Sequence, residues 1–318
     1  MYNICNNLDS EVLEMREVFA KVMSELAKKD EDIIYLDADI INSIKMTNFS
    51  KEFKNQTVNC GIQEANMIGV AAGMSAMGLK PVCHTFAPFA TRRVMDQVFV
   101  SCAYARLNVK IIGSDPGITA GANGGTHIPM EDIGVMRMIP TSTIIEPTDS
   151  VVLEFCLRQV IDLYGLFYLR LSRKKAIKIY EDGSTFEIGK ANILREGNDI
   201  TIIACGICVA DAIAVSDKLK KEGINVRVID MFTIKPIDKD VIIKAAKETK
   251  AIVTVENHNT MNGLGSAVCE VVSEHCPTKV IRLGSKDRFG EVGDIEYLKS
   301  VYGFSQSDIE KAVLSLYR

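Results

Sequence analysis

The sequence has no long apolar run and no excess of basic residues. No segment reaches the roughly 18 uninterrupted apolar residues of a membrane-spanning helix. The 37 lysines and arginines are outnumbered by 41 acidic residues, the formal charge is -4, and no basic stripe with interleaved aromatics is present. These absences predict a protein that neither crosses a membrane nor binds nucleic acid.

Paired cysteines and a secretory signal are also missing. The nine cysteines are an odd number, and the one close pair, Cys205 and Cys208, has no second pair at zinc-binding spacing. Most cysteines stand inside apolar runs, as reduced core residues of cytosolic proteins do. Residues 1–15 contain neither a basic segment nor an apolar one of signal-peptide type. We therefore expect a cytoplasmic protein with reduced thiols.

What is present is an alternation of short β-branched runs with longer amphipathic segments, which favours α/β layers around largely parallel sheets. The first helix is expected within residues 10–30, with Ser10 as its N-cap, and a later helix over residues 92–106. A charged, turn-rich stretch over residues 174–199 predicts a linker. We expect two doubly wound domains, residues 1–185 and residues 186–318. Strands are expected at 32–40, 80–86 and 108–114 in the first domain, and at 200–206, 225–232, 251–257 and 279–285 in the second, smaller one.

Glu64 stands out because small and apolar residues follow it, in "QEANMIGVAAGMSAMG". Burying an ionised carboxylate without a partner is costly, so such a residue is paired, neutralised or used in chemistry. A Glu in the first turn of a helix is commonly only a favourable partner for the helix dipole. In apolar surroundings, however, a carboxylic acid can share a proton with a nitrogen heterocycle.

Other candidate residues lie near the predicted strand ends. Phe86 and Phe89 could stack on a flat ring, although such residues are more often core. The glycine-rich loop of residues 115–129 carries His127 and is too long and too particular in composition for a plain connector. Arg173 follows a strand and could bind an anion. None of these signals is specific alone.

Taken in order, these motifs resemble the C-terminal half of transketolase, a thiamine diphosphate enzyme. Residues 61–78 are similar to the family's segment with the cofactor-activating Glu, and "HTFAPF" to its pyrimidine-stacking strand. "GGTHIP" is similar to its substrate-binding His loop and "LSR" to its sugar-phosphate Arg. "MFTIKPID", "VENHNTMNGLGSAV" and "DRFGEVG" are similar to its C-terminal domain. The resemblance covers nearly the whole chain and implies a pyrimidine-binding domain followed by a transketolase C-terminal domain.

One motif of these enzymes is absent. A Gly-Asp-Gly sequence followed by Asn holds the diphosphate and its magnesium ion, and "EDG" at 181–183 lacks the leading glycine. Mg²⁺ bridging a diphosphate needs such oxygen ligands. The resemblance therefore implies one subunit of a split transketolase. A separate N-terminal, diphosphate-binding subunit would supply the Mg²⁺ ligands, this chain would supply none, and two copies of each would form an α2β2 assembly.

The resemblance also implies roles for single residues. Glu64 would hydrogen-bond the aminopyrimidine and favour the tautomer that takes the proton from the thiazolium carbon. Phe89 would stack on the pyrimidine beside Phe86, Asp39 would lie near the cofactor, and His127 would contact the substrate near its reacting carbon. The reaction implied is transfer of a two-carbon ketol unit from a ketose, or ketose phosphate, to an aldose or aldose phosphate.

The terminal phosphate of the substrate would be held by Arg16, Ser43 and Arg173, since arginine offers forked donors to that anion. Departures from the family pattern lie on this side of the site. Ser114 stands where the family commonly has a His just before the Asp that is Asp115 here. Asn123 stands where an Asp is common, and Arg92 where an aromatic is usual. We expect Ser114 and Asn123 to line a substrate site of altered preference.

Two alternatives remain open. The same two domains form the β subunit of 2-oxo-acid dehydrogenases and part of deoxyxylulose-phosphate synthase, so decarboxylation of a 2-oxo acid is possible, although Arg16, Ser43 and Arg173 favour a sugar phosphate. A regulatory or assembly subunit could keep the fold without the chemistry. Glu64 and Phe89 argue against that second alternative, because an inactive relative is expected to lose one or both.

Overall fold

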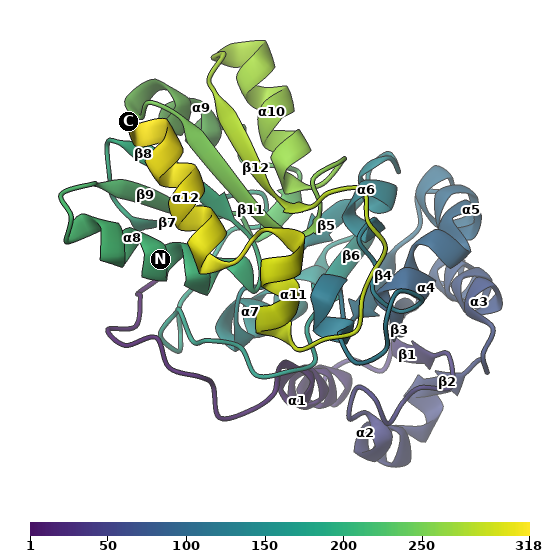
Figure 1. Ribbon diagram of the computed structural model, residues 1–318. Coiled ribbons are helices and arrows are strands. Elements are labelled where there is room, and N and C mark those ends of the chain that lie inside the picture. The colour runs from purple at the N-terminus through teal and green to yellow at the C-terminus, as the bar shows by residue number, and fades with distance from the viewer.

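The computed structural model describes all 318 residues, and Figure 1 shows them as two sheets, each flanked by helices. The larger sheet has seven strands, which run parallel to their neighbours except at one edge. In spatial order they are β10 (Thr233–Lys235), β5 (Thr143–Ile145), β6 (Leu166–Leu171), β4 (Val109–Ser114), β3 (Lys80–Phe86), β1 (Ile33–Asp37) and β2 (Thr57–Asn59). Parallel strands place their carboxyl ends along one edge of the sheet, where open α/β proteins bind ligands.

The smaller sheet has five strands and lies in the second half of the chain. In spatial order they are β12 (Val280–Ser285), β11 (Ile252–Asn259), β8 (Ile200–Ala204), β9 (Val226–Asp230) and β7 (Asn192–Arg195). The predicted α/β class with two largely parallel sheets is thus confirmed. The sequence pattern missed the short strands β2, β7 and β10. Of these, β10 leaves the second half of the chain and pairs antiparallel with β5 of the larger sheet.

Helices cover both faces of each sheet. The helices of the first half are α1 (Met15–Ala27), α2 (Thr47–Glu52), α3 (Glu64–Ala76), α4 (Ala87–Ala90), α5 (Met95–Gln97), α6 (Asp132–Arg137) and α7 (Ser150–Asp162). Those of the second half are α8 (Cys208–Lys220), α9 (Lys239–Glu248), α10 (Leu264–His275), α11 (Ile295–Tyr302) and α12 (Gln306–Tyr317). Short 3-10 turns cover Lys54–Gln56, Arg92–Val94 and Gly117–Ala120, and a π-helical segment covers Val98–Tyr104. None of the helices combines the length and apolar content that crossing a bilayer requires.

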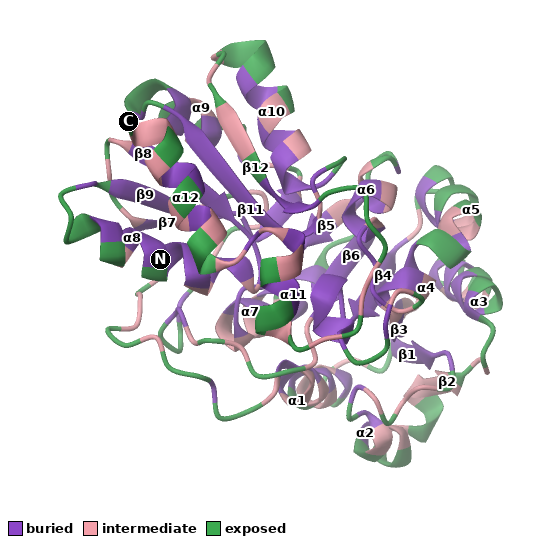
Figure 2. Cartoon of the chain, in the orientation of Figure 1, coloured by how far each residue is buried: buried purple, intermediate pink, exposed green.

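Alternating side chains of each strand face different helix layers. In β8, Ile202 packs in a cluster with residues of α8 and α12, whereas Ile203 packs in a second cluster with residues of α9 and α10. Figure 2 shows the central strands of the smaller sheet, β8, β9 and β11, buried along almost their whole length. A strand covered on both faces has no polar side to alternate with, which explains why the sequence shows continuous β-branched runs. Both hydrophobic clusters draw residues from both halves of the chain.

Two predicted helices differ in detail from the structure. The first helix begins at Met15, where Glu14 and Glu17 form a reciprocal capping box, so the prediction of Ser10 as its N-cap was wrong. Ser10 instead forms an isolated β-bridge with Ile177. The helix expected over residues 92–106 is broken into a 3-10 turn, a single α-turn and a π-helical segment. Arg92 and Arg93 belong to the 3-10 turn at its start.

A fully buried guanidinium joins the two halves of the molecule. Arg170 on β6 donates to both carboxylate oxygens of Asp132, at 2.7 and 3.0 Å, and lies 2.7 Å from Glu146. It also donates to the main-chain oxygen of Asn257 on β11, at 3.0 Å. Burial alone would raise the pKa of Asp132, but the charge and hydrogen bonds of Arg170 hold that pKa below its ordinary value. The charge of Arg170 is therefore balanced inside the protein.

We expect Arg170→Met to lower the free energy of unfolding by about 3–5 kcal/mol, because the change leaves buried carboxylates without their cation. Urea unfolding followed by circular dichroism measures it. The matched control is Arg195→Met, since Arg195 makes a similar two-pronged pair with Asp217 at 2.7 and 2.9 Å but is partly exposed. Arg195→Met should lower the free energy of unfolding by no more than about 1 kcal/mol. Equal losses in the two variants would contradict the assignment.

Candidate functional site

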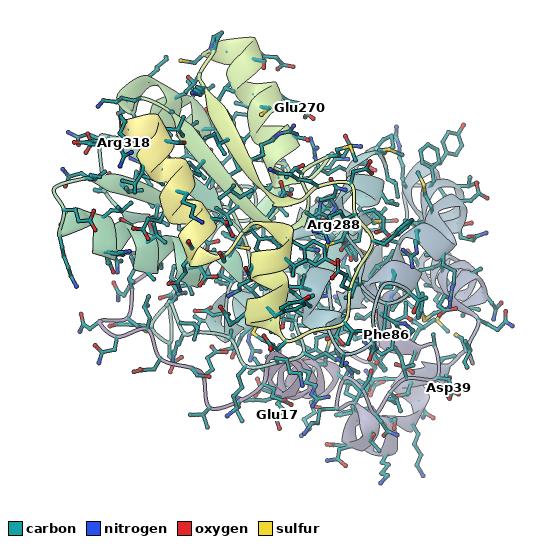
Figure 3. The ribbon with its side chains drawn as sticks, in the orientation of Figure 1. Glu17, Asp39, Phe86, Glu270, Arg288 and Arg318 are labelled. Atoms are coloured by element: carbon teal, nitrogen blue, oxygen red, sulfur yellow. The ribbon has the colours of Figure 1, made fainter.

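The site lies at the carboxyl ends of β1, β3, β4 and β6. Phe86 is the last residue of β3, and Asp115 and Arg173 follow β4 and β6 directly or within two residues. Asp39 follows β1 in a left-handed conformation with φ of 65°. Figure 3 labels Asp39 and Phe86 on the same side of the molecule. The fold therefore gathers residues that are far apart in sequence along this edge.

Glu64 is the first residue of α3, and only 6% of its side chain is exposed. Its Oε1 lies 2.7 Å from Nη1 of Arg93. The guanidinium carbon of Arg93 also lies 3.7 Å from the centre of the Phe89 ring. The carboxylate that looks isolated in the sequence is thus paired, and its partner cation covers the face of an aromatic ring.

Three rings form the middle of the site. The centre of the His127 ring lies 5.2 Å from that of Phe89 and 5.8 Å from that of Phe86, both edge-on. The two phenylalanine rings are 6.2 Å apart. All three side chains are partly exposed. Together with Glu64 they form a group of inclined aromatic rings with a carboxylate at one end, which suits a nitrogen heterocycle.

Arg92 and the C-terminal half of the chain hold the loop that carries His127. Nη2 of Arg92 donates to the main-chain oxygen of Thr126 at 2.9 Å, and its Nη1 pairs with Glu131 at 2.6 Å. On the other side, a Cβ at Gly290 would lie 2.6 Å from Ile128, so the two segments touch. Arg92 therefore ties the 3-10 turn of residues 92–94 to the loop that carries His127.

A pocket of opposite charges lies beyond Phe86. Arg16 on α1 donates to the main-chain oxygen of Ser43 at 2.9 Å, and Arg173 approaches the same oxygen at 3.4 Å. Arg173 also forms an ion pair with Asp115 and lies 5.1 Å from the centre of the Phe86 ring. The structure thus brings together the three residues expected to hold a terminal phosphate, and it adds a carboxylate that the sequence reasoning did not assign.

The chain takes a constrained path through this pocket. Asp115 has φ of 54°, which is uncommon for a residue with a side chain. Gly117 has φ of 53°, and a Cβ there would lie 2.1 Å from Oδ1 of Asn257. Only glycine fits that position. Strained backbone of this kind is found at functional sites.

Ser114 lies beneath the pocket, in a buried hydrogen-bonded chain that the sequence did not reveal. Its Oγ is 3.0 Å from Nε2 of His84, and Nδ1 of His84 is 3.1 Å from Oδ2 of Asp37. The hydroxyl of Tyr35 donates to the same Asp37 oxygen at 2.8 Å. None of these side chains has exposed surface. These hydrogen bonds therefore link β1, β3 and β4. Ser114 contacts His84 and is not exposed to solvent.

The remaining predicted residues lie at the rim. Asp39 is exposed and accepts a hydrogen bond from Asn59 at 2.9 Å. Asn123 is exposed in the loop before His127. No group of three or more His, Cys, Asp or Glu side chains is arranged to hold a metal ion. Glu64 and the rings of Phe86 and Phe89 are the groups whose chemistry suits a heterocyclic cofactor.

Two family models match the sequence of the chain. The transketolase pyrimidine-binding domain matches residues 11–177, and the transketolase C-terminal domain matches residues 189–309. The chain belongs to the transketolase family, whose members generally use thiamine diphosphate.

Within that family the chain is similar to separately encoded subunits. It is 45% identical over 298 residues to the 6-deoxy-6-sulfo-D-fructose transketolase subunit of Clostridium sp. strain MSTE9, covering 94% of this chain and 92% of the relative. It is 37% identical over 304 residues to one subunit of the apulose-4-phosphate transketolase of Phocaeicola vulgatus, covering 95% and 97%. A solved split-gene transketolase, an inactive β4 tetramer, superposes with a TM-score of 0.87 at 36% identity, covering 96% of this chain and 98% of that one.

The pair of Glu64 and Arg93 can be measured in the chain alone. We expect a double-mutant cycle of Glu64→Gln and Arg93→Met, followed by urea unfolding, to give a coupling of about 1 kcal/mol. This value allows for Arg93, whose side chain is 44% exposed. The neighbouring pair of Arg92 and Glu131, exposed on both sides, should give less than about 0.5 kcal/mol. A coupling no larger than that of the control pair would show that Arg93 does not hold the carboxylate.

Proposed function

We propose that this chain is the pyrimidine-binding, C-terminal subunit of a two-chain transketolase. The assembled enzyme transfers a two-carbon ketol unit from a ketose to an aldose, with thiamine diphosphate as cofactor. The observation that carries the proposal is a continuous line of groups across the site. It runs from the buried carboxylate of Glu64 over the rings of Phe89, His127 and Phe86 to the charged pocket at Arg173.

Thiamine diphosphate, when bound, supplies the carbanion chemistry of the reaction. The part of this chain is to orient the heterocycle and to control one proton. Glu64 would hydrogen-bond a ring nitrogen, and Phe89 would lie against the ring face. Arg93 contacts both of these groups in the structure, so its guanidinium has to move aside for a ring to reach them. Glu64 is only 5% exposed, so water has little access to it.

The substrate would lie between His127 and the charged pocket. His127 is partly exposed beside Phe86 and Phe89, where it can hydrogen-bond a hydroxyl near the reacting carbon. Arg16 and Arg173 would receive the charged end of the sugar. Because this pocket holds two arginines, it favours a sugar with a charged terminus over a short 2-oxo acid. One relative is named for a sulfo sugar and another for a sugar phosphate, and both fit this pattern.

The diphosphate and Mg²⁺ would be bound by a partner chain with the Gly-Asp-Gly motif, in an α2β2 assembly. The names of the relatives support this, because they are subunits, and a split-gene neighbour associates with itself as a β4 tetramer. The sequence of this chain has no Gly-Asp-Gly motif. All nine thiols are free, which agrees with a cytoplasmic location.

We expect Glu64→Gln to leave the assembled complex intact but to slow exchange of the thiazolium proton by about 10²–10⁴-fold, because the amide cannot share a proton with the ring. Hydrogen–deuterium exchange of the bound cofactor, followed by NMR after acid quench, measures it. The control is Glu270→Gln, an exposed glutamate paired with Arg137. Exchange within a few-fold of wild type would remove Glu64 from its proposed role.

The isolated chain should bind thiamine diphosphate no more tightly than about millimolar, with or without Mg²⁺, since ring stacking and one hydrogen bond are all it offers. Titration calorimetry measures this binding. Addition of the diphosphate-binding subunit should restore tight, magnesium-dependent binding together with ketol transfer. Micromolar, magnesium-dependent binding to this chain alone would show that it makes its own diphosphate site, and the two-chain proposal would fail.

A further inference from the structure

The glycine-rich loop of residues 115–129 lies against the C-terminal half of the chain. The main-chain nitrogen of Gly293 donates to the main-chain oxygen of Gly121 at 3.2 Å, in the segment that runs from β12 to α11 in Figure 1. Just after the loop, the main-chain nitrogen of Asn259 on β11 donates to the main-chain oxygen of Met130 at 2.9 Å. Two parts of the C-terminal half therefore border the loop.

The start of the loop is held by the side-chain amide of Asn257 on β11. Its Nδ2 donates to the main-chain oxygen of Pro116 at 3.0 Å, and its Oδ1 accepts from the main-chain nitrogen of Ile118 at 2.8 Å. The side chain of Asn257 has no exposed surface, so water does not compete for these bonds. A carboxamide offers a donor and an acceptor on one flat group, and an apolar side chain of similar size offers neither.

The turn between these two hydrogen bonds has an unusual backbone. Asp115 has φ of 54° and Gly117 has φ of 53°. A Cβ at Gly117 would overlap the side chain of Asn257, so the turn and the amide are in direct contact. Backbone of this kind persists only where its surroundings hold it in place. The two bonds of Asn257 enclose the turn and supply that restraint.

We propose that Asn257 is a positioning residue of the site. Its amide holds the turn of residues 115–118, and the turn places Asp115 beside Arg173 and begins the loop that carries His127. Asn257 acts through this turn and has no direct part in the chemistry. The C-terminal half of the chain thereby shapes the substrate side of the site but not the Glu64 side. This inference rests on the proposed transketolase function.

The first test measures amide hydrogen exchange in the isolated chain by NMR. Asn257→Leu keeps a similar side-chain volume but removes both hydrogen bonds. Exchange of the Ile118 amide should become about 10-fold faster or more, because that amide loses its acceptor. The control is Asn192→Leu, at another buried asparagine of the C-terminal half, whose Nδ2 donates to the hydroxyl of Tyr180 at 3.0 Å. It should leave Ile118 exchange within about 2-fold of wild type.

The second test uses the complex with the diphosphate-binding subunit. The ketol donor is whichever of D-xylulose 5-phosphate, D-fructose 6-phosphate and D-fructose wild type uses fastest. Asn257→Leu should lower kcat/KM by about 10-fold or more, because a small misplacement of substrate-contacting groups is costly. Exchange of the thiazolium proton, which reports on Glu64, should stay within about 2-fold of wild type. Asn192→Leu should change neither quantity, so the split between them distinguishes positioning from a general loss of stability.

Gly117→Ala disturbs the same turn from the first half of the chain, since the added Cβ would meet Asn257. It should give the same split between kcat/KM and proton exchange. The double variant of Gly117→Ala with Asn257→Leu should lose less than the product of the two single losses, because both changes act through one turn. Circular dichroism and the urea midpoint verify folding, and Gly117→Ala is judged by the same criteria if Asn257→Leu does not fold.

The outcomes separate the inference from the proposed function. Unchanged Ile118 exchange in Asn257→Leu, a kcat/KM within about 2-fold of wild type, or a parallel loss of thiazolium proton exchange would each overturn the inference and leave the proposed function standing. If the wild-type complex neither exchanges that proton nor uses any of the donors, the proposed function fails, and the role of Asn257 fails with it. Faster Ile118 exchange, a lower kcat/KM and unchanged proton exchange support both.

Discussion

A guanidinium that is fully cut off from water can be kept only where carboxylates and carbonyls surround it, and Arg170 depends on Asp132, Glu146 and Asn257 for this. The partners come from α6, from the turn after β5 and from β11 of the smaller sheet. Their positions cannot drift without leaving a charge uncompensated. Since Arg173 lies three residues further along the same strand end, the constraint that fixes Arg170 also fixes where the charged pocket opens.

The Glu64 end of the site also has its buried charge paired with an opposite charge. Glu64 is buried, and Arg93 balances it while lying on Phe89. Under the proposed function, a ring bound at Phe89 would displace Arg93 from Glu64 and become the hydrogen-bond partner of that carboxylate in its place. Arg16, Arg173 and Glu64 each have an oppositely charged partner, so none of these charges is left uncompensated inside the protein. The apolar rings between them carry no charge that needs compensation.

The layering of the chain was readable in the sequence because burial on both faces leaves continuous apolar runs, as at β8. The strands that were missed, β2, β7 and β10, lie at sheet edges and have only three or four residues each. So few residues do not show a recognisable alternation of apolar and polar side chains. Motif order pointed to Glu64, Phe89 and Arg173 as a group. Contacts made by main-chain atoms or between residues distant in sequence cannot be predicted from motifs. The contacts of Arg93 and Asp115 and the hydrogen bonds of His84 were therefore found only in the structure.

The strand β10 limits how the two sheets can be separated. It belongs by sequence to the second half but closes the edge of the first sheet beside β5. Just beyond β5, the main-chain nitrogen of Glu146 donates to the main-chain oxygen of Phe232 at 2.8 Å, which extends this seam. A polypeptide cut between the two halves would leave β5 as an open edge, a template for pairing with other chains. The pyrimidine-binding and C-terminal parts are therefore not interchangeable modules, and separating them would expose the first to aggregation as well as weaken it.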